Sequence, residues 1–316
     1  QVALRAVRDA ALICRQVQAS LPHRGVLTKN DESPVTVADF ASQAIIVGHL
    51  LRHEPNVSIV AEEESHALKQ PENSTLLAAE TRLVKSVHPE TTDRQILEWL
   101  GANKSEQKAS RFWTIDPIDG TKGFISGRQY AIALALVEQG QVQIGVLGCP
   151  NMTAPDQSKG TLFLATQTVQ AVQIPINDLS CTSPIAVSDI SEPASGTVCE
   201  SVEPSHSDHT TSKKIASALG IEGSTFRIDS QCKYAAVARG DASIYLRLPT
   251  RKNYQEKIWD HAAGVAIIQS AGGTVTDVDG QPLDFTCGHL LTKNRGIVAT
   301  GGSIHAEVLA AVQTAT

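Results

Sequence analysis

Apolar residues recur at helical spacing near the start of the chain and give way to strand-like runs further along. Residues 2–20 place small apolar side chains on one face and arginines on the other, which predicts an amphipathic helix. A second helix is expected from about Val37, and short strands are expected at 57–61 and 112–115. Residues 64–110 are polar and helix-prone, and they carry no recognisable chemistry.

The middle of the chain predicts a β-hairpin. Two apolar runs, 131–137 and 142–147, flank a polar turn with the sequence EQGQ. Residues 153–160 (TAPDQSKG) are interpreted as a loop or linker between two lobes. We therefore expect an N-terminal α+β lobe over 1–155 and a C-terminal α/β lobe over 156–316.

The second half alternates short strands with helices, which indicates layered α/β or α+β architecture. The expected strands are 162–165, 185–188, 197–200, 243–248 and 296–300, and the expected helices are 211–219, 231–238, 260–271 and one at the end of the chain.

Composition and charge narrow the possible partners. The chain has 316 residues, 41% of them hydrophobic and 19% charged, which is typical of a globular protein. The net charge is -6, which disfavours a nucleic-acid partner, and no apolar run is long enough to cross a membrane. The six cysteines lack zinc-site spacing and fit a reducing compartment. We expect a cytoplasmic monomer that binds a small-molecule substrate.

The strongest chemical signal is the segment 113–121 (WTIDPIDGT). Asp116 and Asp119 stand three residues apart after an apolar run, and Pro117 between them fixes the backbone. Gly120 permits a tight turn. Carboxylates on a stiff turn suit a hard divalent cation, although an ordinary Asp-Pro turn explains the same residues.

Three further acidic positions have plain structural readings when each is taken alone. Glu62 opens a run of three glutamates after the strand expected at 57–61, and such runs are usually solvated. Asp260 precedes an apolar helix and fits a helix cap, and Asp39 stands near the start of the second helix.

Together these segments resemble the inositol monophosphatase superfamily of lithium-sensitive, magnesium-dependent phosphatases. The matching segments are 31–40 (DESPVTVADF), 60–65 (VAEEES), 113–121 (WTIDPIDGT), 258–264 (IWDHAAG) and 271–274 (AGGT). Their order and spacing match over essentially the whole chain. The resemblance implies an α/β (α+β) fold, a layered αβαβα sandwich. Ala61 departs from the glycine that the family usually has, a small change that we expect to preserve metal binding.

Within that superfamily the chain is similar to 3′(2′),5′-bisphosphate nucleotidases of the fungal type. The segments that carry this finer resemblance are 120–124 (GTKGF), 141–151 (QVQIGVLGCPN), 230–234 (SQCKY), 245–249 (YLRLP) and 254–264 (YQEKIWDHAAG). It implies removal of the 3′-phosphate from 3′-phosphoadenosine 5′-phosphate, giving AMP and phosphate, and action on the related 5′-phosphosulfate. It also implies a role in sulfur assimilation and salt tolerance.

Other functions remain as alternatives. An inositol polyphosphate 1-phosphatase or an inositol monophosphatase is the nearest one, although the GTKGF and YQEKIWDHAAG segments argue against it. A non-catalytic sensor on the same fold would be expected to lack part of the acid set, which is complete here. A two-metal nuclease is disfavoured by the acidic net charge.

The resemblance also implies residue roles. Up to three Mg²⁺ ions would be held by Glu62, Asp116, the Ile118 carbonyl, Asp119 and Asp260. Asp39 and Thr121 would activate the attacking water, and the N–H groups of Gly120 and Thr121 would bind the scissile phosphate. His206, Ser230, Lys233 and Arg247 would contact the nucleotide, although His206 also fits a surface loop. The N-terminal lobe would thus carry most metal ligands, and the C-terminal lobe would carry the nucleotide-binding residues and the last metal ligand. Inhibition by Li⁺ is expected, and Na⁺ is a second candidate inhibitor.

Overall fold

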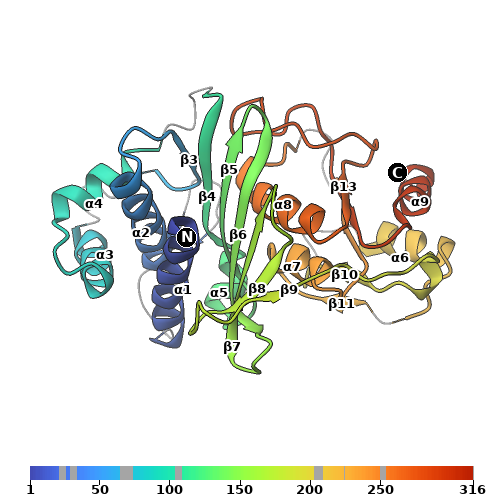
Figure 1. Cartoon of the computed structure of the whole chain (residues 1–316), viewed down its shortest axis with the longest axis horizontal. Coiled ribbons are helices and arrows are strands. Elements are labelled where there is room, and N and C mark those ends of the chain that lie inside the picture. The colour runs from blue at the N-terminus through green and yellow to red at the C-terminus, as the bar shows by residue number, and fades with distance from the viewer. Residues whose placement is uncertain are drawn as a thin grey trace.

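The computed structural model describes residues 1–20, 26–28, 34–64, 74–103, 109–202, 209–223, 225–249 and 254–315. These residues form alternating layers of helix, sheet, helix, sheet and helix, as expected (Figure 1). His206 lies outside the described residues.

The first helical layer and the larger sheet form one half of the molecule. The helices are α1 (Val2–Ser20), α2 (Val37–His53), α3 (Ser74–Val87) and α4 (Asp93–Leu100). The sheet has the order β3-β4-β5-β6-β7-β8-β9, with β3 (Ile59–Ala61), β4 (Arg111–Asp119), β5 (Ala131–Glu138), β6 (Gln141–Thr153), β7 (Lys159–Thr166), β8 (Val172–Pro175) and β9 (Ser183–Pro184). A small antiparallel pair, β1 (Val26–Thr28) and β2 (Pro34–Thr36), precedes α2, and the short α5 (Thr121–Ile125) follows β4.

The second half is built on the smaller sheet. Its order is β11-β10-β12-β14-β13, with β10 (Val198–Glu200), β11 (Phe226–Arg227), β12 (Ile244–Arg247), β13 (Thr274–Thr276) and β14 (Ile297–Thr300). Helices α7 (Cys232–Ala238) and α8 (Ala262–Ser270) lie between the two sheets, and α6 (His209–Ala218) and α9 (His305–Ala315) pack on the outside. Two 3₁₀ turns complete the order, η3 (Pro193–Ser195) and η5 (Ile258–Asp260).

Most expected elements are present, and the central hairpin is confirmed with Glu138 opposite Gln141. Residues 185–188 were expected as a strand but have no strand assignment; there the N–H of Val187 donates to the carbonyl of Ala271 in a loop. The expected helix 260–271 is divided at His261 into η5 and α8.

The segment expected as a linker, 153–160, forms the turn between β6 and β7, where Thr153 pairs with Lys159. The lobe boundary expected at 155/156 therefore falls between two adjacent strands of the same sheet. Because β9 is the last strand of that sheet, we propose that the division between the two halves follows Pro184.

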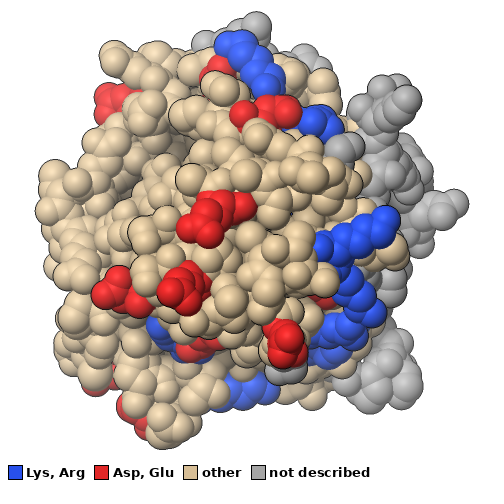
Figure 2. Space-filling view, turned by 90° about the vertical axis from the view of Figure 1, so that its right-hand side faces the viewer, with Lys and Arg blue, Asp and Glu red and all other residues tan. Residues whose placement is uncertain are grey.

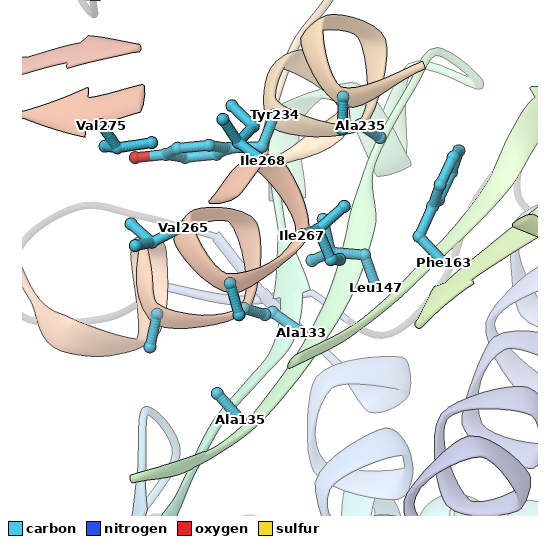
Figure 3. Packing of buried hydrophobic residues seen from close by; sticks show 14 of the residues in the cluster. Ala133, Ala135, Leu147, Phe163, Tyr234, Ala235, Val265, Ile267, Ile268 and Val275 are labelled. Atoms are coloured by element: carbon cyan, nitrogen blue, oxygen red, sulfur yellow. The ribbon is translucent and has the colours of Figure 1, made fainter. Parts of the chain in front are cut away.

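A large apolar cluster occupies much of the interior between the two sheets (Figure 3). Ala133 and Leu147 of the large sheet face Ile267 of α8, and small alanines let the helix approach closely. Gly264 lies against the ring of Tyr234, and a Cβ at this position would come within 2.3 Å of the ring. The close packing of α7 on α8 therefore requires glycine here.

A buried acid occupies the outer helical layer. Glu80 on α3 is fully buried, and its carboxylate oxygens make no hydrogen bond to the part of the chain that is described. Burial raises the pKa of Glu80 to about 8. None of the described helices is both long and apolar enough for a membrane span.

Surface charge is mixed on the face that carries the outer helices of the smaller sheet. Figure 2 shows acidic side chains across the middle of this face and basic side chains toward its right-hand edge, with others at its top and bottom. Among the described residues, acidic and basic groups therefore alternate over this face.

Candidate active site

The acidic side of the site is built at the ends of two neighbouring strands. Strands β3 and β4 are parallel, with Ala61 opposite Ile115, so the residues that follow them leave the sheet together. The N–H of Glu62 donates to the carbonyl of Ile115 at 3.2 Å. Asp116, the next residue of β4, is only 2% exposed. The fold thus places Glu62 and Asp116 side by side, although they are far apart in sequence.

An irregularity in β4 turns the second aspartate toward the other half of the molecule. The pairing register with β5 shifts between Asp116 and Asp119. The Ser42 hydroxyl of α2 donates to the Pro117 carbonyl at 2.9 Å and fixes the bulge. Asp119 then accepts a hydrogen bond from the N–H of Gln231 at 2.5 Å. This contact joins the end of β4 directly to the segment that opens α7.

Electrostatics show that the acids form one cluster. Burial raises the pKa of Asp116 well above its usual range, and the charges of Glu62, Asp119, Asp260 and Asp39 raise it further. Burial and Asp260 raise the pKa of Asp119 to about 7, against the opposing effect of nearby cations. Five acidic side chains expected from the sequence therefore lie within electrostatic reach of one another.

The donor set fits a hard divalent cation. Asp116 Oδ1 is buried and makes no hydrogen bond with any described residue. An orphaned, buried carboxylate oxygen among like charges is costly unless a cation meets it, and carboxylate oxygens are the ligands that Mg²⁺ prefers. Asp260 also belongs to a tight trio with Glu256 and His261, in which the possible ligand atoms lie within 4.8 Å of one another.

The turn after Asp119 has the shape expected for close approach of a ligand to the backbone. Gly120 has a φ of 88°, and a Cβ there would meet the Cβ of Ser230 at 3.0 Å. The Thr121 hydroxyl donates to the Ile118 carbonyl at 3.3 Å. Asp39, near the start of α2, is 2% exposed and raises the pKa of Asp116.

Two basic side chains, Lys233 and Arg247, also lie close enough to Asp119 to affect its pKa. Lys233, on α7, is 4% exposed, and its Nζ lies 5.3 Å from the ring centre of Tyr245. Burial lowers the pKa of Lys233, against the effect of Asp119. Arg247 ends β12 and donates from Nη2 to Asp260 Oδ2 at 3.4 Å. Both cations oppose the rise in the pKa of Asp119, which places them at the same site as the acids.

Several polar residues of the site had no role in the sequence interpretation. Gln231 binds Asp119 through its N–H, Trp259 through its side-chain amide, and Gly264 through its side-chain oxygen. It therefore holds the β4 bulge, η5 and α8 together.

Two further groups of the site also became apparent only in the fold. Glu256 binds both Arg247 and His261. Burial acts to raise the pKa of Glu256, but Arg247 and His261 lower it to about 2. Gln43 exchanges two hydrogen bonds with the backbone of Glu63 and so fixes the glutamate run. The segments SQCKY and YQEKIWDHAAG contain two of these groups, but polarity alone does not reveal a partner across the fold.

Known proteins resemble this chain over nearly its full length. The family model described as the inositol monophosphatase family matches residues 1–316. A 3′(2′),5′-bisphosphate nucleotidase of Emericella nidulans is 39% identical over 99% of this chain and 96% of its own length. A 3′(2′),5′-bisphosphate nucleotidase of Oryza sativa is 42% identical over 99% of this chain and 93% of its own length.

Solved structures share the fold at low identity. An IMPase of Thermotoga maritima matches with a TM-score of 0.67 at 20% identity, covering 99% of this chain and 95% of its own. The extragenic suppressor protein suhB of Bartonella henselae matches with a TM-score of 0.68 at 20% identity, covering 99% and 97% of the two chains. The full-length family match, with these relatives and the acid cluster on β3, β4 and η5, shows that the chain belongs to the inositol monophosphatase family.

Proposed function

We propose that this protein is a magnesium-dependent phosphoric monoester hydrolase that removes the 3′-phosphate of 3′-phosphoadenosine 5′-phosphate. One observation carries the proposal: an acid cluster that needs added positive charge adjoins two cations, the buried Lys233 and the partly buried Arg247, which suit a second anionic group. A substrate with one phosphate to be hydrolysed and another to be held fits both sides. Curated relatives bear the name of this activity.

The acids would hold the metal. Glu62, Asp116, Asp119, Asp260 and the Ile118 carbonyl form the donor set, which suits up to three ions as expected for the family. Bound Mg²⁺ would offset the charge of the phosphate monoester and favour attack by water. The protein contributes the fixed separation of the donors, because the bulge between Asp116 and Asp119 is anchored to both α2 and α7.

The proposed proton acceptor is the pair of Asp39 and Thr121. The Thr121 hydroxyl already lies 3.3 Å from the Ile118 carbonyl, so it borders the donor set. A hydroxyl at this place can orient an attacking water, and Asp39 can accept the proton that is released. The backbone N–H groups of Gly120 and Thr121, at a turn that only a residue with positive φ fits, would bind the scissile phosphate.

The nucleotide would lie against the second half of the molecule. Lys233 and Arg247 would bind the retained 5′-phosphate, for which planar guanidinium and compact ammonium groups are both suited. Ser230, held at a φ of 63°, touches the Gly120 turn and can contact the sugar between the two phosphates. The same arrangement would admit the 5′-phosphosulfate.

A phosphate-release assay tests this proposal. The purified chain should release phosphate from 3′-phosphoadenosine 5′-phosphate only when Mg²⁺ is present, and much faster than from inositol 1-phosphate. Li⁺ should inhibit at concentrations at which K⁺ does not, because it fits an oxygen-lined site but carries half the charge of Mg²⁺. Preference for inositol 1-phosphate would replace the substrate assignment, and full activity in chelator would overturn the metal-dependent reaction.

A further inference from the structure

We propose that Glu256 is a positioning residue that presents Arg247 to the non-reacting phosphate of the substrate. The inference rests on the proposed function, because it assumes that Arg247 meets a second anion. It adds a residue that acts through another side chain, and a test that separates its contribution from the reaction at the metal site.

Glu256 forms a two-point contact with one edge of the Arg247 guanidinium. Arg247 Nε donates to Glu256 Oε1 at 2.9 Å, and Nη2 lies 2.8 Å from Glu256 Oε2. Two parallel bonds of this kind fix the plane of the guanidinium as well as its position. The weaker contacts to Tyr254 and Asp260 also use Nη2. These contacts and a further hydrogen bond with the Tyr245 side chain hold the guanidinium, with its Nε and Nη2 edge turned toward Glu256.

The Glu256 carboxylate also contacts a buried histidine. Glu256 is 5% exposed, and its Oε2 lies 3.1 Å from His261 Nε2. His261 is fully buried, and its Nδ1 lies 2.8 Å from the Tyr234 hydroxyl. With the proton on Nε2, His261 donates to Glu256 and accepts from the Tyr234 hydroxyl. Tyr234, His261 and Glu256 are therefore linked by consecutive hydrogen bonds. Gly264 allows the Tyr234 ring to lie against α8 and completes the support.

This arrangement differs from an ordinary surface ion pair. A free arginine side chain loses several rotatable bonds when it binds an anion, and that entropy weakens binding. Here the side-chain entropy of Arg247 is already lost on folding, because Glu256 holds it in one orientation before the substrate binds. Glu256 should therefore affect substrates with a second phosphate and leave substrates without one unchanged.

Two substrates distinguish this role from a general structural one. Steady-state kinetics should be measured with 3′-phosphoadenosine 5′-phosphate and with adenosine 3′-monophosphate, which lacks the 5′-phosphate. In Glu256→Gln we expect KM for the bisphosphate to rise about tenfold with kcat within about twofold, because one charge-assisted pair is lost. KM for the monophosphate should stay the same. In the Arg247→Ala background, Glu256→Gln should cause no further loss.

Control variants keep the test decisive. Glu138→Gln removes an exposed carboxylate at the far end of β5 and should change neither KM. If Glu256→Gln fails to fold, Arg247→Lys replaces it as the test variant. Lysine keeps the positive charge but cannot make two parallel hydrogen bonds to the Glu256 carboxylate. Arg247→Lys should then lose most of the preference for the bisphosphate.

The outcomes separate the two proposals. A parent enzyme that does not prefer the bisphosphate over the monophosphate would overturn the proposed function. A parent that prefers it through Arg247, combined with a Glu256→Gln variant that keeps the preference, would overturn only the positioning role. An equal rise of KM on both substrates would also overturn it, since a merely structural defect does not discriminate between them.

Discussion

The two sides of the site handle charge in opposite ways. On the side of the large sheet, Asp116 is buried among acids and has an oxygen with no hydrogen bond to a described residue. On the side of the small sheet, Arg247 is only partly buried and is paired with the buried Glu256 carboxylate. The first side needs a cation to balance its charge, whereas on the second side the arginine already has a matching carboxylate on folding. The acidic side is therefore suited to a metal cation, and the basic side is suited to an anionic group of the substrate.

The largest expected effect comes from neutralising the acidic side. Asp116→Asn should reduce turnover by several orders of magnitude, because the variant loses a carboxylate proposed to be shared by two metal ions. Without Mg²⁺ the same variant should melt at a higher temperature than the parent, since burial and four acidic neighbours disfavour the charged form. Turnover and thermal melting in chelator measure the two effects. Near-parental turnover at saturating Mg²⁺ would contradict the comparison.

A second substitution on the acidic side distinguishes orientation of the attacking water from binding of the metal. Thr121→Ala should lower kcat by about 10²–10⁴, because it removes the hydroxyl proposed to orient the water but keeps every carboxylate. Calorimetric titration with Mg²⁺ should give nearly parental binding. Loss of Mg²⁺ binding in this variant would mean that Thr121 supports the donor set and not the water.

The basic side should respond in binding more than in turnover. Arg247→Ala should raise KM for 3′-phosphoadenosine 5′-phosphate by about 10–100-fold, because a charge-assisted pair to a remote phosphate is lost. Turnover of inositol 1,4-bisphosphate, if the enzyme accepts it, should fall less. Equal losses on both substrates would argue against a nucleotide-specific role.

The smallest functional effect is expected from Glu80, a buried acid outside the site. Its folded pKa of about 8 lies above the ordinary value of 4.5, so the folded state keeps a proton that the unfolded state releases. The free energy of unfolding should therefore fall as pH rises from about 4.5 to about 8, by at most about 1.4 kcal/mol for each pH unit.

Glu80→Gln should remove that fall and leave kcat unchanged. Denaturant unfolding at several pH values measures the effect, with Glu98→Gln as an exposed control on α4. A parallel pH dependence in parent and Glu80→Gln would contradict it. The variant sharpens the comparison because Glu80 is a buried acid without a cluster of acidic neighbours.

The sequence alone was sufficient for the layers and for the acids. Amphipathic and alternating patterns located α1, α2 and the β5–β6 hairpin, because a single buried face determines each pattern. The aspartates of β4 stood out because proline and glycine accompany them. Of the two interpretations of 153–160, loop or linker between lobes, the structure has a loop, the β6–β7 turn; the sequence did not distinguish them because a polar hairpin turn and a polar linker have the same composition.

Contacts across the fold could not be predicted in this way. Gln231 and Glu256 look like ordinary polar residues in sequence. The fold brings Gln231 against η5 and α8, and it brings Glu256 against Arg247 at the end of β12. The run of three glutamates likewise does not show that Gln43 clamps the backbone of the middle one. Such pairings depend on how elements that are distant in sequence pack together, which no local pattern records.

The hydrogen bond from Gln231 to Asp119 has a consequence for how the enzyme acquires activity during folding. It crosses from the segment before α7 to the end of β4, so the bulge proposed to bind metal is held by a part of the chain made more than 100 residues later. In refolding experiments, secondary structure should therefore return before Mg²⁺ binding does. Tight metal binding would then serve as a kinetic signal for the moment at which the two sheets dock.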